Sequence, residues 1–517
     1  MIFSFFFLVY LLSNGGHLDY YDGTSAFLMT ENFVLHGNPL AISIDSPSLK
    51  YLGFPIEQHI IIQATMRASA EYDRHEETYL NENVTKSEFI QQYLKNIDKK
   101  DFLNGNYVVL PVLAAPLYMI AQLSGVSPFH FVPLFLNSII LSIDCVLVFL
   151  IGRFLYVSSR IGFVLSLIFG VTSFIWPYVG TMLADPIATM FLLLAIYLVV
   201  IQRNRSGLAI AFLAGISSGL SFLSYSLYAI FIPGVLFFGF LEFRKNKKQL
   251  IVFIIGMLVI GILQAYLDYS RFGSIFDNGI GDPTGGVLSK ISIVGIFGYL
   301  FSPGRSICLY FPITVLYPAS LYFLYKQDKN IAILFLYASL IGFLFIAISQ
   351  QWWDQTEWGS HRYHLAIIPF ITLAIGSIIS KFGNNLKIIL SMIILSTLGF
   401  CVNLFAVLIG YEHAFSYAYV QERFEQYPYA GFTWNSYYSP IVQTLKVLMS
   451  NWLSALPPNP KIGLDGCSFD LYLYCNFGLL PLILIFVVIS IISFLIIRIA
   501  SSGNSEISRE NNKDGNV

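Results

Sequence analysis

The sequence predicts an all-α protein that crosses a membrane many times, and both its composition and its apolar runs support this. Charged residues make up 11% of the 517 residues and hydrophobic residues 56%, whereas charged residues make up about 25% of an ordinary soluble domain. A membrane-spanning helix needs roughly 20 mainly apolar residues. Eleven stretches of about that length recur, at 131–151, 161–178, 184–201, 207–224, 227–241, 250–267, 306–325, 330–349, 363–380, 388–409 and 477–497.

Basic side chains favour one orientation of these spans. Loops rich in Lys and Arg stay on the cytoplasmic side, and twelve basic residues lie in alternate connections, against two acids, Glu242 and Asp328. The basic residues are Arg153, Arg160, Arg203, Arg205, Arg244, Lys245, Lys247, Lys248, Lys326, Lys329, Lys381 and Lys387. We therefore expect a multi-pass plasma-membrane protein with a cytoplasmic N-terminus. Its functional site is expected on the external face, because the cytoplasmic turns are too short to build one.

The predicted spans divide the chain into six parts. These are a first transmembrane helix, 1–13; an external catalytic loop with interfacial helices, 14–130; a transmembrane core, 131–409; an external loop, 410–476; a last span, 477–497; and a cytoplasmic tail, 498–517. The first helix is short for a span, so we expect it to be incomplete or the true start to lie upstream.

Residues 107–124 decide the side on which the polar stretch before them lies. If this apolar segment crosses the membrane, 14–106 is cytoplasmic, and if it only enters the interface, 14–106 is external. Pro111 and Pro116 interrupt the segment, and no basic residue closely flanks it. Because proline disrupts a helix interior, we expect a re-entrant or interfacial segment and an external loop.

Two carboxylates directly follow the first apolar stretch. Asp19 and Asp22 precede a predicted helix that Thr24 can cap and that Gly37-Asn38-Pro39 ends. A carboxylate at the membrane surface can act as a general base on a hydroxyl group. Taken alone, the pair is explained more simply by acidic residues that stabilise a helix N-terminus.

Candidate substrate-binding residues recur at the external ends of later spans. Arg305 follows a Pro-Gly turn, and Arg362 lies at the mouth of the span that follows it. Guanidinium groups make forked bonds to phosphate, although either side chain could instead snorkel to the interface. Beside Arg362, Glu357, Trp358 and His361 supply a carboxylate, a ring that could stack on a sugar and an imidazole. A tryptophan also favours the interface without any ligand.

Other polar residues are weaker candidates. Asp144 and Asp185 are costly in a membrane and are therefore functional candidates, but Asp144 could also be neutral and bonded to a neighbouring helix. No histidine has second and third ligands at a metal-like spacing, so no structural zinc site is expected. Cys467 and Cys475 share an external loop and could form a disulfide, while the other cysteines are expected to be buried.

The order of several motifs resembles a known superfamily. After the early acidic pair come NYVVLPVLAAPLYMIA (106–121), SFIWPYVGTMLADPIA (173–188), AGISSGLSFLSYSLYAIFIPG (214–234), RFGSIFDNG (271–279), YLFSPGRSICLYFP (299–312) and WGSHRYHLAIIPF (358–370). Over about residues 17–380 the chain resembles the GT-C superfamily of integral-membrane glycosyltransferases. More closely, it is similar to prokaryotic relatives of the dolichyl-phosphate-mannose protein mannosyltransferases and of the lipid A aminoarabinose transferases. The resemblance implies a GT-C-like bundle of about 11–13 transmembrane helices with interfacial helices in a large first external loop.

The resemblance also implies roles for individual residues. An acidic residue of the first external loop serves such enzymes as general base, which maps to Asp22 or Asp19. We prefer Asp22 because it immediately precedes the predicted helix. Arg305 and Arg362 match the interfacial basic residues that hold a lipid phosphate.

The implied function is transfer of a sugar from a polyprenyl-phosphate donor to a protein, lipid or glycan acceptor, as in protein glycosylation or cell-envelope synthesis. The expected partners are the polyprenyl-phosphate-linked sugar, membrane lipids and an acceptor of unknown identity. A net charge of −1 gives no sign of nucleic acid. The resemblance implies no definite cofactor, and the carboxylates could recruit a divalent cation, as some members of the superfamily do.

A multi-spanning transporter or a flippase of lipid-linked sugars is the alternative. Transporters tend to contain internal repeats. We find none between 131–267 and 306–497.

Overall fold

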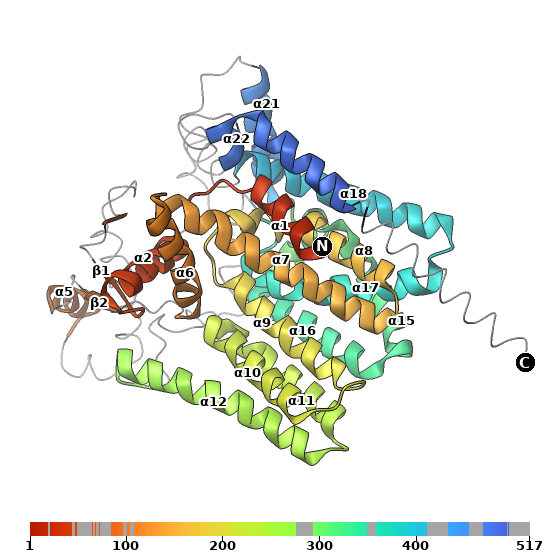
Figure 1. The fold of residues 1–517 in the computed structure, drawn as a ribbon, viewed down its shortest axis with the longest axis horizontal. Coiled ribbons are helices and arrows are strands. Elements are labelled where there is room, and N and C mark those ends of the chain that lie inside the picture. Colours follow the sequence, from red (N-terminus) through yellow and green to blue (C-terminus); the bar gives the residue numbers. More distant parts are fainter. Residues whose placement is uncertain are drawn as a thin grey trace, which may run out of the picture.

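The computed structural model is built almost entirely of helices (Figure 1). It describes residues 1–18, 21–43, 47–48, 65, 68, 72, 84–96, 101–103, 108–275, 293–348, 358–410, 433–453, 469–493 and 495. The predicted all-α class is therefore confirmed. The described strands, β1 (Ala41–Ser43) and β2 (Asp101–Leu103), form one short antiparallel pair with Ile42 opposite Phe102.

The first part of the chain forms α1 (Ile2–Leu12), α2 (Tyr21–His36), α5 (Lys86–Asn96) and α6 (Val109–Ser124). The bundle then contains α7 (Pro128–Tyr156), α8 (Ser159–Thr172), η2 (Trp176–Gly180), α9 (Asp185–Ile201), α10 (Leu208–Ser224), η3 (Ser226–Phe231), α11 (Ile232–Phe243) and α12 (Lys247–Phe272). It continues with α13 (Val294–Phe301), α14 (Ile307–Tyr310), η4 (Pro312–Leu316), α15 (Tyr317–Gln327), α16 (Lys329–Ala347), η5 (Arg362–Ile367), α17 (Ile368–Phe382) and α18 (Leu386–Ile409). The last elements are η7 (Ser436–Tyr438), α21 (Pro440–Leu453), α22 (Tyr472–Phe477) and a helix at Leu479–Ser493.

Six helices among the described residues are long and apolar enough to cross a membrane. They are Pro128–Tyr156, Ser226–Phe243, Lys247–Phe272, Lys329–Ala347, Arg362–Phe382 and Leu386–Ile409. Shorter apolar helices occupy four of the other predicted spans, and α8, for example, ends at Thr172 inside the predicted 161–178. The predicted 306–325 is divided among α14, η4 and α15. The sequence therefore located the apolar segments but overestimated the length of several helices.

Proline accounts for part of this difference. The 3₁₀ segments η3, η4 and η5 each run directly into an α-helix whose second residue is proline, namely Pro233 in α11, Pro318 in α15 and Pro369 in α17. Proline has no N–H and is tolerated in the first helical turn, where that donor would have no partner within the helix. The predicted spans 227–241 and 363–380 are thus each a tight 3₁₀ turn followed by an α-helix, and 306–325 has the short α14 ahead of the same arrangement.

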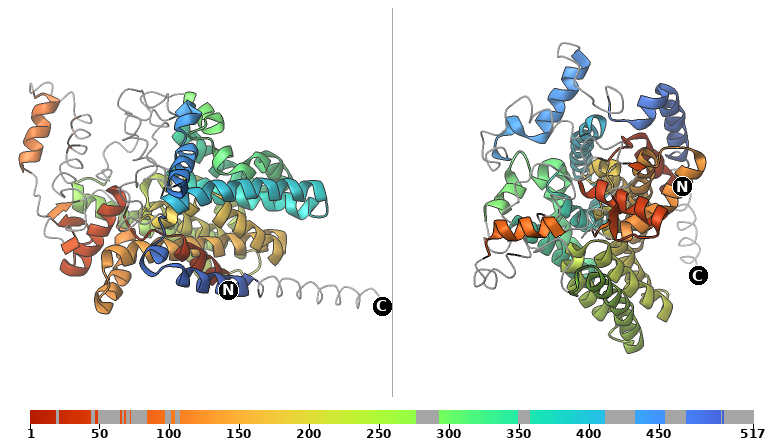
Figure 2. Two further views of the ribbon diagram at one scale, coloured as in Figure 1. Left: turned by 90° about the horizontal axis from the view of Figure 1, so that it is seen from above. Right: turned by 90° about the vertical axis from the view of Figure 1, so that its left-hand side faces the viewer.

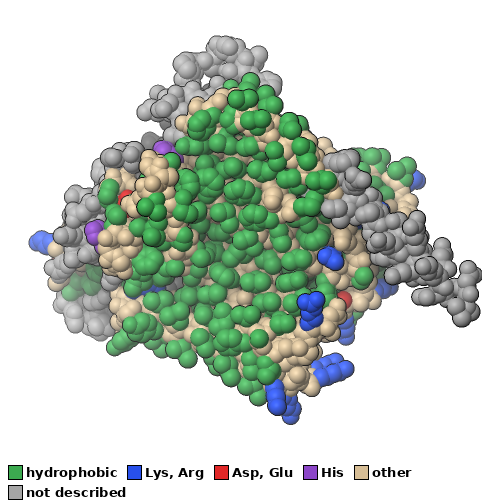
Figure 3. All heavy atoms as spheres, viewed as in Figure 1, with side chains coloured by type: hydrophobic (Ala, Val, Ile, Leu, Met, Phe, Trp, Pro, Cys, Tyr) green, Lys and Arg blue, Asp and Glu red, His purple; other side chains and the backbone are tan. Residues whose placement is uncertain are grey.

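Charged side chains join the ends of three helices at one end of the bundle. Arg203, just after α9, donates to both carboxylate oxygens of Glu242 at 2.8 and 2.6 Å and also pairs with Asp328. Asn330 donates to the same Glu242 at 3.0 Å. These residues lie in or beside three connections that were predicted to be cytoplasmic. Figure 3 shows Lys and Arg side chains gathered toward one edge of a broad hydrophobic face.

The helices α2 and α6 lie toward the other end of the bundle (Figures 1 and 2). The buried Glu31 of α2 accepts hydrogen bonds from Tyr118 of α6 and from Ser48, both at 2.6 Å. Burial raises the pKa of the Tyr118 hydroxyl, and the hydrogen bond to Glu31 raises it further, by a smaller amount. The hydroxyl therefore keeps its proton and donates it in this bond. The 16 residues of α6 span about 24 Å at 1.5 Å per residue, less than the roughly 30 Å hydrocarbon core.

The start of α2 differs from the prediction. The helix begins at Tyr21, so Thr24 lies inside the first turns and does not cap it. Its end is as predicted, because Gly37 follows with a φ of 75°. Asp22 is therefore a residue of the first helical turn, where the partial positive charge of the helix N-terminus favours a carboxylate.

Candidate active site

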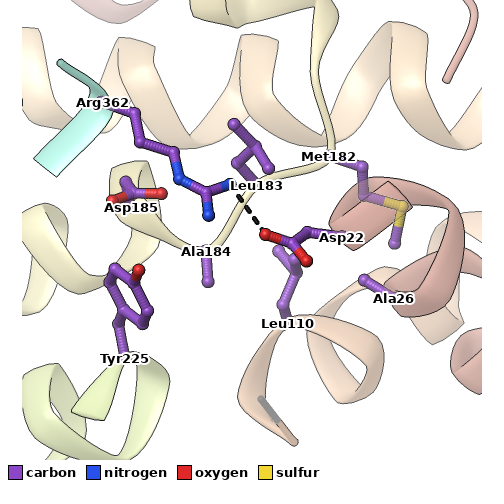
Figure 4. A pocket seen from close by; sticks show the side chains of 9 residues that line it. All are labelled: Asp22, Ala26, Leu110, Met182, Leu183, Ala184, Asp185, Tyr225 and Arg362. Atoms are coloured by element: carbon purple, nitrogen blue, oxygen red, sulfur yellow. Dashed lines mark ion pairs between the residues drawn. The ribbon is translucent and has the colours of Figure 1, made fainter. Parts of the chain in front are cut away.

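A small pocket lies where α2 and α6 meet the ends of α9, α10 and η5 (Figure 4). It has about 240 Å³ of empty space, part of which is open to the outside. Its walls are Asp22, Ala26, Leu110, Met182, Leu183, Ala184, Asp185, Tyr225 and Arg362. The pocket therefore combines an apolar lining with two carboxylates, one guanidinium and one phenol.

An ion pair crosses this pocket. Arg362 Nη1 donates to Asp22 Oδ2 at 2.8 Å, with the arginine side chain 14% and the aspartate side chain 31% exposed. Arg362 is the first residue of η5 and Asp22 lies in the first turn of α2, so two helix starts meet here. The bond is charge-assisted. Figure 4 shows the other oxygen of Asp22 pointing away from Arg362.

Asp185 and Tyr225 complete the polar lining. Asp185 is the first residue of α9 and is 2% exposed, and its backbone carbonyl accepts a bond from Tyr228 at 3.1 Å. Tyr225 follows α10, and its ring contacts those of Tyr228 and Tyr363 at centroid distances of 5.9 and 5.6 Å. Tyr225 is thus held by neighbouring rings while it faces the pocket.

The segment just before Arg362 is anchored at successive residues. Trp358 donates from its indole to Asn403 at 2.9 Å, and its carbonyl accepts from Tyr178 at 2.8 Å. Arg305 Nη1 donates to the Gly359 carbonyl at 3.3 Å.

Gly359 tightens this arrangement. It has a φ of 84°, and an added Cβ would lie 2.7 Å from the ring of Phe174. These contacts leave Arg362 little freedom at its backbone.

The predicted substrate-binding residues around Arg362 occupy other places. Trp358 and Arg305 are fully buried, and neither lines the pocket. His361 is 6% exposed and accepts from the Tyr363 N–H at 3.3 Å, so it caps η5. Trp358 packs in the core, and Arg305 and His361 bond to the segment that carries Arg362. Their contact with a substrate stays a prediction.

Two predicted residues, Asp19 and Glu357, lie outside the described part of the chain. The predictions missed Tyr225 and the Met182–Ala184 wall and gave Asp185 no place in the site. Tyr225 and Asp185 both stand at the external ends of predicted spans. This position at the end of a span is the sequence feature that could have identified both residues. A tyrosine is also common at the membrane interface without any function.

The donor set does not suit a divalent cation. Among the described residues no three His, Cys, Asp or Glu side chains gather closely enough to hold a metal ion. Between Asp22 and Asp185, a cation would compete with the guanidinium of Arg362, which already pairs with Asp22.

Other candidates lie away from the pocket. Asp144 is fully buried in α7, and neither of its carboxylate oxygens has a hydrogen-bond partner among the described residues. Cys475 is disulfide-bonded, Cys145 and Cys308 are free, as is Cys401, and Cys467 lies outside the described residues. Of the cysteines expected to be buried, Cys145 is buried and the other two free ones are only partly so.

No family model matches the chain, and no curated protein matches its sequence. Among solved structures, the chain is similar to the crystal structure of ArnT from Cupriavidus metallidurans bound to undecaprenyl phosphate. The two share 11% sequence identity over 88% of this chain and 79% of that chain, with a TM-score of 0.46. A likeness at this level assigns no residue and no activity to the present chain.

Proposed function

We propose that the chain is a membrane glycosyltransferase that moves a sugar from a polyprenyl-phosphate donor to a hydroxyl acceptor. The proposal rests on one observation above others, the 2.8 Å pair of Asp22 and Arg362 in a pocket at the end of a hydrophobic bundle. A carboxylate that can take a proton and a guanidinium that can hold a phosphate lie side by side there. The order of the sequence motifs supports the same class of reaction.

In the proposed reaction, an acceptor hydroxyl oxygen attacks the anomeric carbon of the donor sugar. The bond from that carbon to the phosphate oxygen breaks, and the lipid phosphate leaves with the electron pair. Asp22 accepts the hydroxyl proton. Arg362 offsets the charge that develops on the phosphate, and because a guanidinium carries five N–H donors it can bond the carboxylate and the phosphate together.

We propose that this reaction takes place on the external side. Supporting this, α9 begins at the pocket residue Asp185 and ends two residues before Arg203, which belongs to the basic end of the bundle. Basic connections favour the cytoplasmic side. The pocket and these connections therefore lie at opposite ends of α9, which supports the proposal.

The test is release of free polyprenyl phosphate by the purified protein in lipid nanodiscs. A panel of polyprenyl-phosphate-linked hexoses and amino sugars is supplied with hydroxyl acceptors, and a matched panel of nucleotide sugars is the control. We expect release of polyprenyl phosphate and transfer of sugar to the acceptor from at least one lipid-linked donor, and no transfer of sugar from any nucleotide sugar. Movement of intact donor across the bilayer without cleavage would contradict the proposal and favour a flippase.

A further inference from the structure

A contact between the two ends of the chain lies just ahead of the helix that carries Asp22. Residues 469–472 pack against residues 14–17, and we call this contact the clasp. His17 Nε2 lies 2.6 Å from Asp470 Oδ1, and the side chains are 16% and 8% exposed. The Tyr472 N–H donates to the Asn14 carbonyl at 2.9 Å.

The N-terminal half of the clasp is tied to the bundle through Asn14. The side-chain amide of this fully buried residue donates to the carbonyls of Pro133, Leu134 and Val179 at 3.1, 3.0 and 3.1 Å. Pro133 and Leu134 belong to α7, and Val179 belongs to η2, which precedes the Met182–Asp185 wall of the pocket. Asn14 thus links the clasp to the same segment that lines the pocket.

The C-terminal half is equally fixed. The Asp470 N–H donates to the Leu408 carbonyl, in α18, at 2.8 Å. A Cβ at Gly16, whose φ is 65°, would lie 2.7 Å from the Tyr472 ring, so the two segments touch without a gap. Cys475, in α22, is disulfide-bonded.

The position of the clasp along the chain gives it a mechanical consequence. His17 precedes Asp22 by five positions, and Asp22 already belongs to α2. The start of α2 thus follows the clasp closely along the chain and lines the pocket. A shift of about 1 Å in a catalytic group can lower the rate roughly a hundredfold. A small displacement of Asp22 after loss of the clasp should therefore lower the rate of transfer.

We propose that His17 and Asp470 are positioning residues that hold Asp22 opposite Arg362. This rests on the proposed function. The His17–Asp470 pair joins residues 453 positions apart, so the C-terminal external segment takes part in building the N-terminal catalytic site. The pair does not contact the substrate and acts only through the start of α2.

The test compares His17→Asp, Asp470→His and the double variant that exchanges the two residues. His17→Asp places two carboxylates opposite each other and Asp470→His places two imidazoles there, so each single variant removes the imidazole–carboxylate bond, whereas the double variant restores it with the residues exchanged. We expect kcat to fall about tenfold to a hundredfold in each single variant, the donor KM to stay near that of the wild type, and the double variant to recover most of the loss. Glu242→Gln, which weakens the pair with Arg203 at the other end, is the matched control and should leave kcat unchanged.

Hydrogen exchange of the α2 amides in substrate-free protein provides a second measurement that needs no activity. The exchange rate of the amides at residues 21–26 should rise in both single variants and should return to the wild-type rate in the double variant. Wild-type kcat in the single variants, or no recovery in the double variant, would overturn the proposal. If the wild-type protein transfers no sugar, the proposed function fails, and the exchange result alone decides: an increase that the double variant reverses supports the clasp, and unchanged exchange refutes it.

Discussion

The Nη1 atom of Arg362 lies 2.8 Å from Oδ2 of Asp22, and this bond joins the first residue of η5 to the first turn of α2 across the pocket. Because both residues belong to helix starts, each is placed by backbone that is itself hydrogen-bonded. The pair places the proposed base directly beside the guanidinium that is proposed to bind the phosphate.

Replacing Arg362 should weaken binding of the lipid phosphate. A hydrogen bond to a charged group contributes about 1.5–3 kcal/mol, so Arg362→Ala should raise the Kd for a short-chain polyprenyl phosphate by about tenfold or more. Arg362→Lys keeps the charge but loses the planar fork of the guanidinium. Its Kd should therefore lie between those of the wild type and of Arg362→Ala. Titration in nanodiscs measures this, with Arg203→Ala as the control, and an unchanged Kd for Arg362→Ala would remove this residue from the phosphate site.

Replacing Arg305 should loosen the backbone before Arg362. The bond from Arg305 to the Gly359 carbonyl is buried, and its loss leaves a buried acceptor without that donor. We expect Arg305→Met to lower the Tm and to speed hydrogen exchange at residues 358–367 in protein without substrate. A residue whose role is only to touch the substrate phosphate would leave the substrate-free protein unchanged, so normal exchange would argue for the direct role that the sequence suggested.

Asp144 should be dispensable for transfer. Its carboxylate is buried in α7 and has no hydrogen-bond partner among the described residues, and such a group costs about 1–3 kcal/mol. Asp144→Leu, which is similar in size and apolar, should therefore raise the Tm without changing the transfer rate. If transfer is lost in a stable Asp144→Leu protein, the residue has a function inside the membrane, as expected of an ion-coupled transporter.

The sequence predicted the helices better than their ends. Apolar runs locate membrane helices because every backbone polar group in lipid must be bonded internally, and helices were found at the predicted spans. The first and last residues of the helices were harder to predict, because they depend on proline and on tertiary contacts. Pro233, Pro318 and Pro369 allow 3₁₀ starts that hydrophobicity alone does not reveal.

The candidate site was predicted in part for a similar reason. Asp22 and Arg362 stood out because few charges lie at the external ends of spans, and the structure brings the two together. Arg305 and Trp358 stood out in the same way but are fully buried, because sequence gives the depth of a residue along a span and not the face it occupies. Tyr225 resembled an ordinary interfacial tyrosine, and only its place beside the pocket distinguishes it.

The most direct measurement is the rate of polyprenyl-phosphate release by Asp22→Asn. The amide keeps the size and the hydrogen-bonding oxygen of the aspartate but cannot accept the acceptor proton as a carboxylate does. Asp268→Asn is the matched control, because Asp268 also pairs with an arginine, Arg271, at 2.9 Å but lies outside the pocket.

We expect Asp22→Asn to insert and melt like the wild-type protein and still to bind polyprenyl phosphate, with transfer reduced by at least about a hundredfold, while Asp268→Asn transfers normally. Full transfer by a folded Asp22→Asn protein would contradict the account.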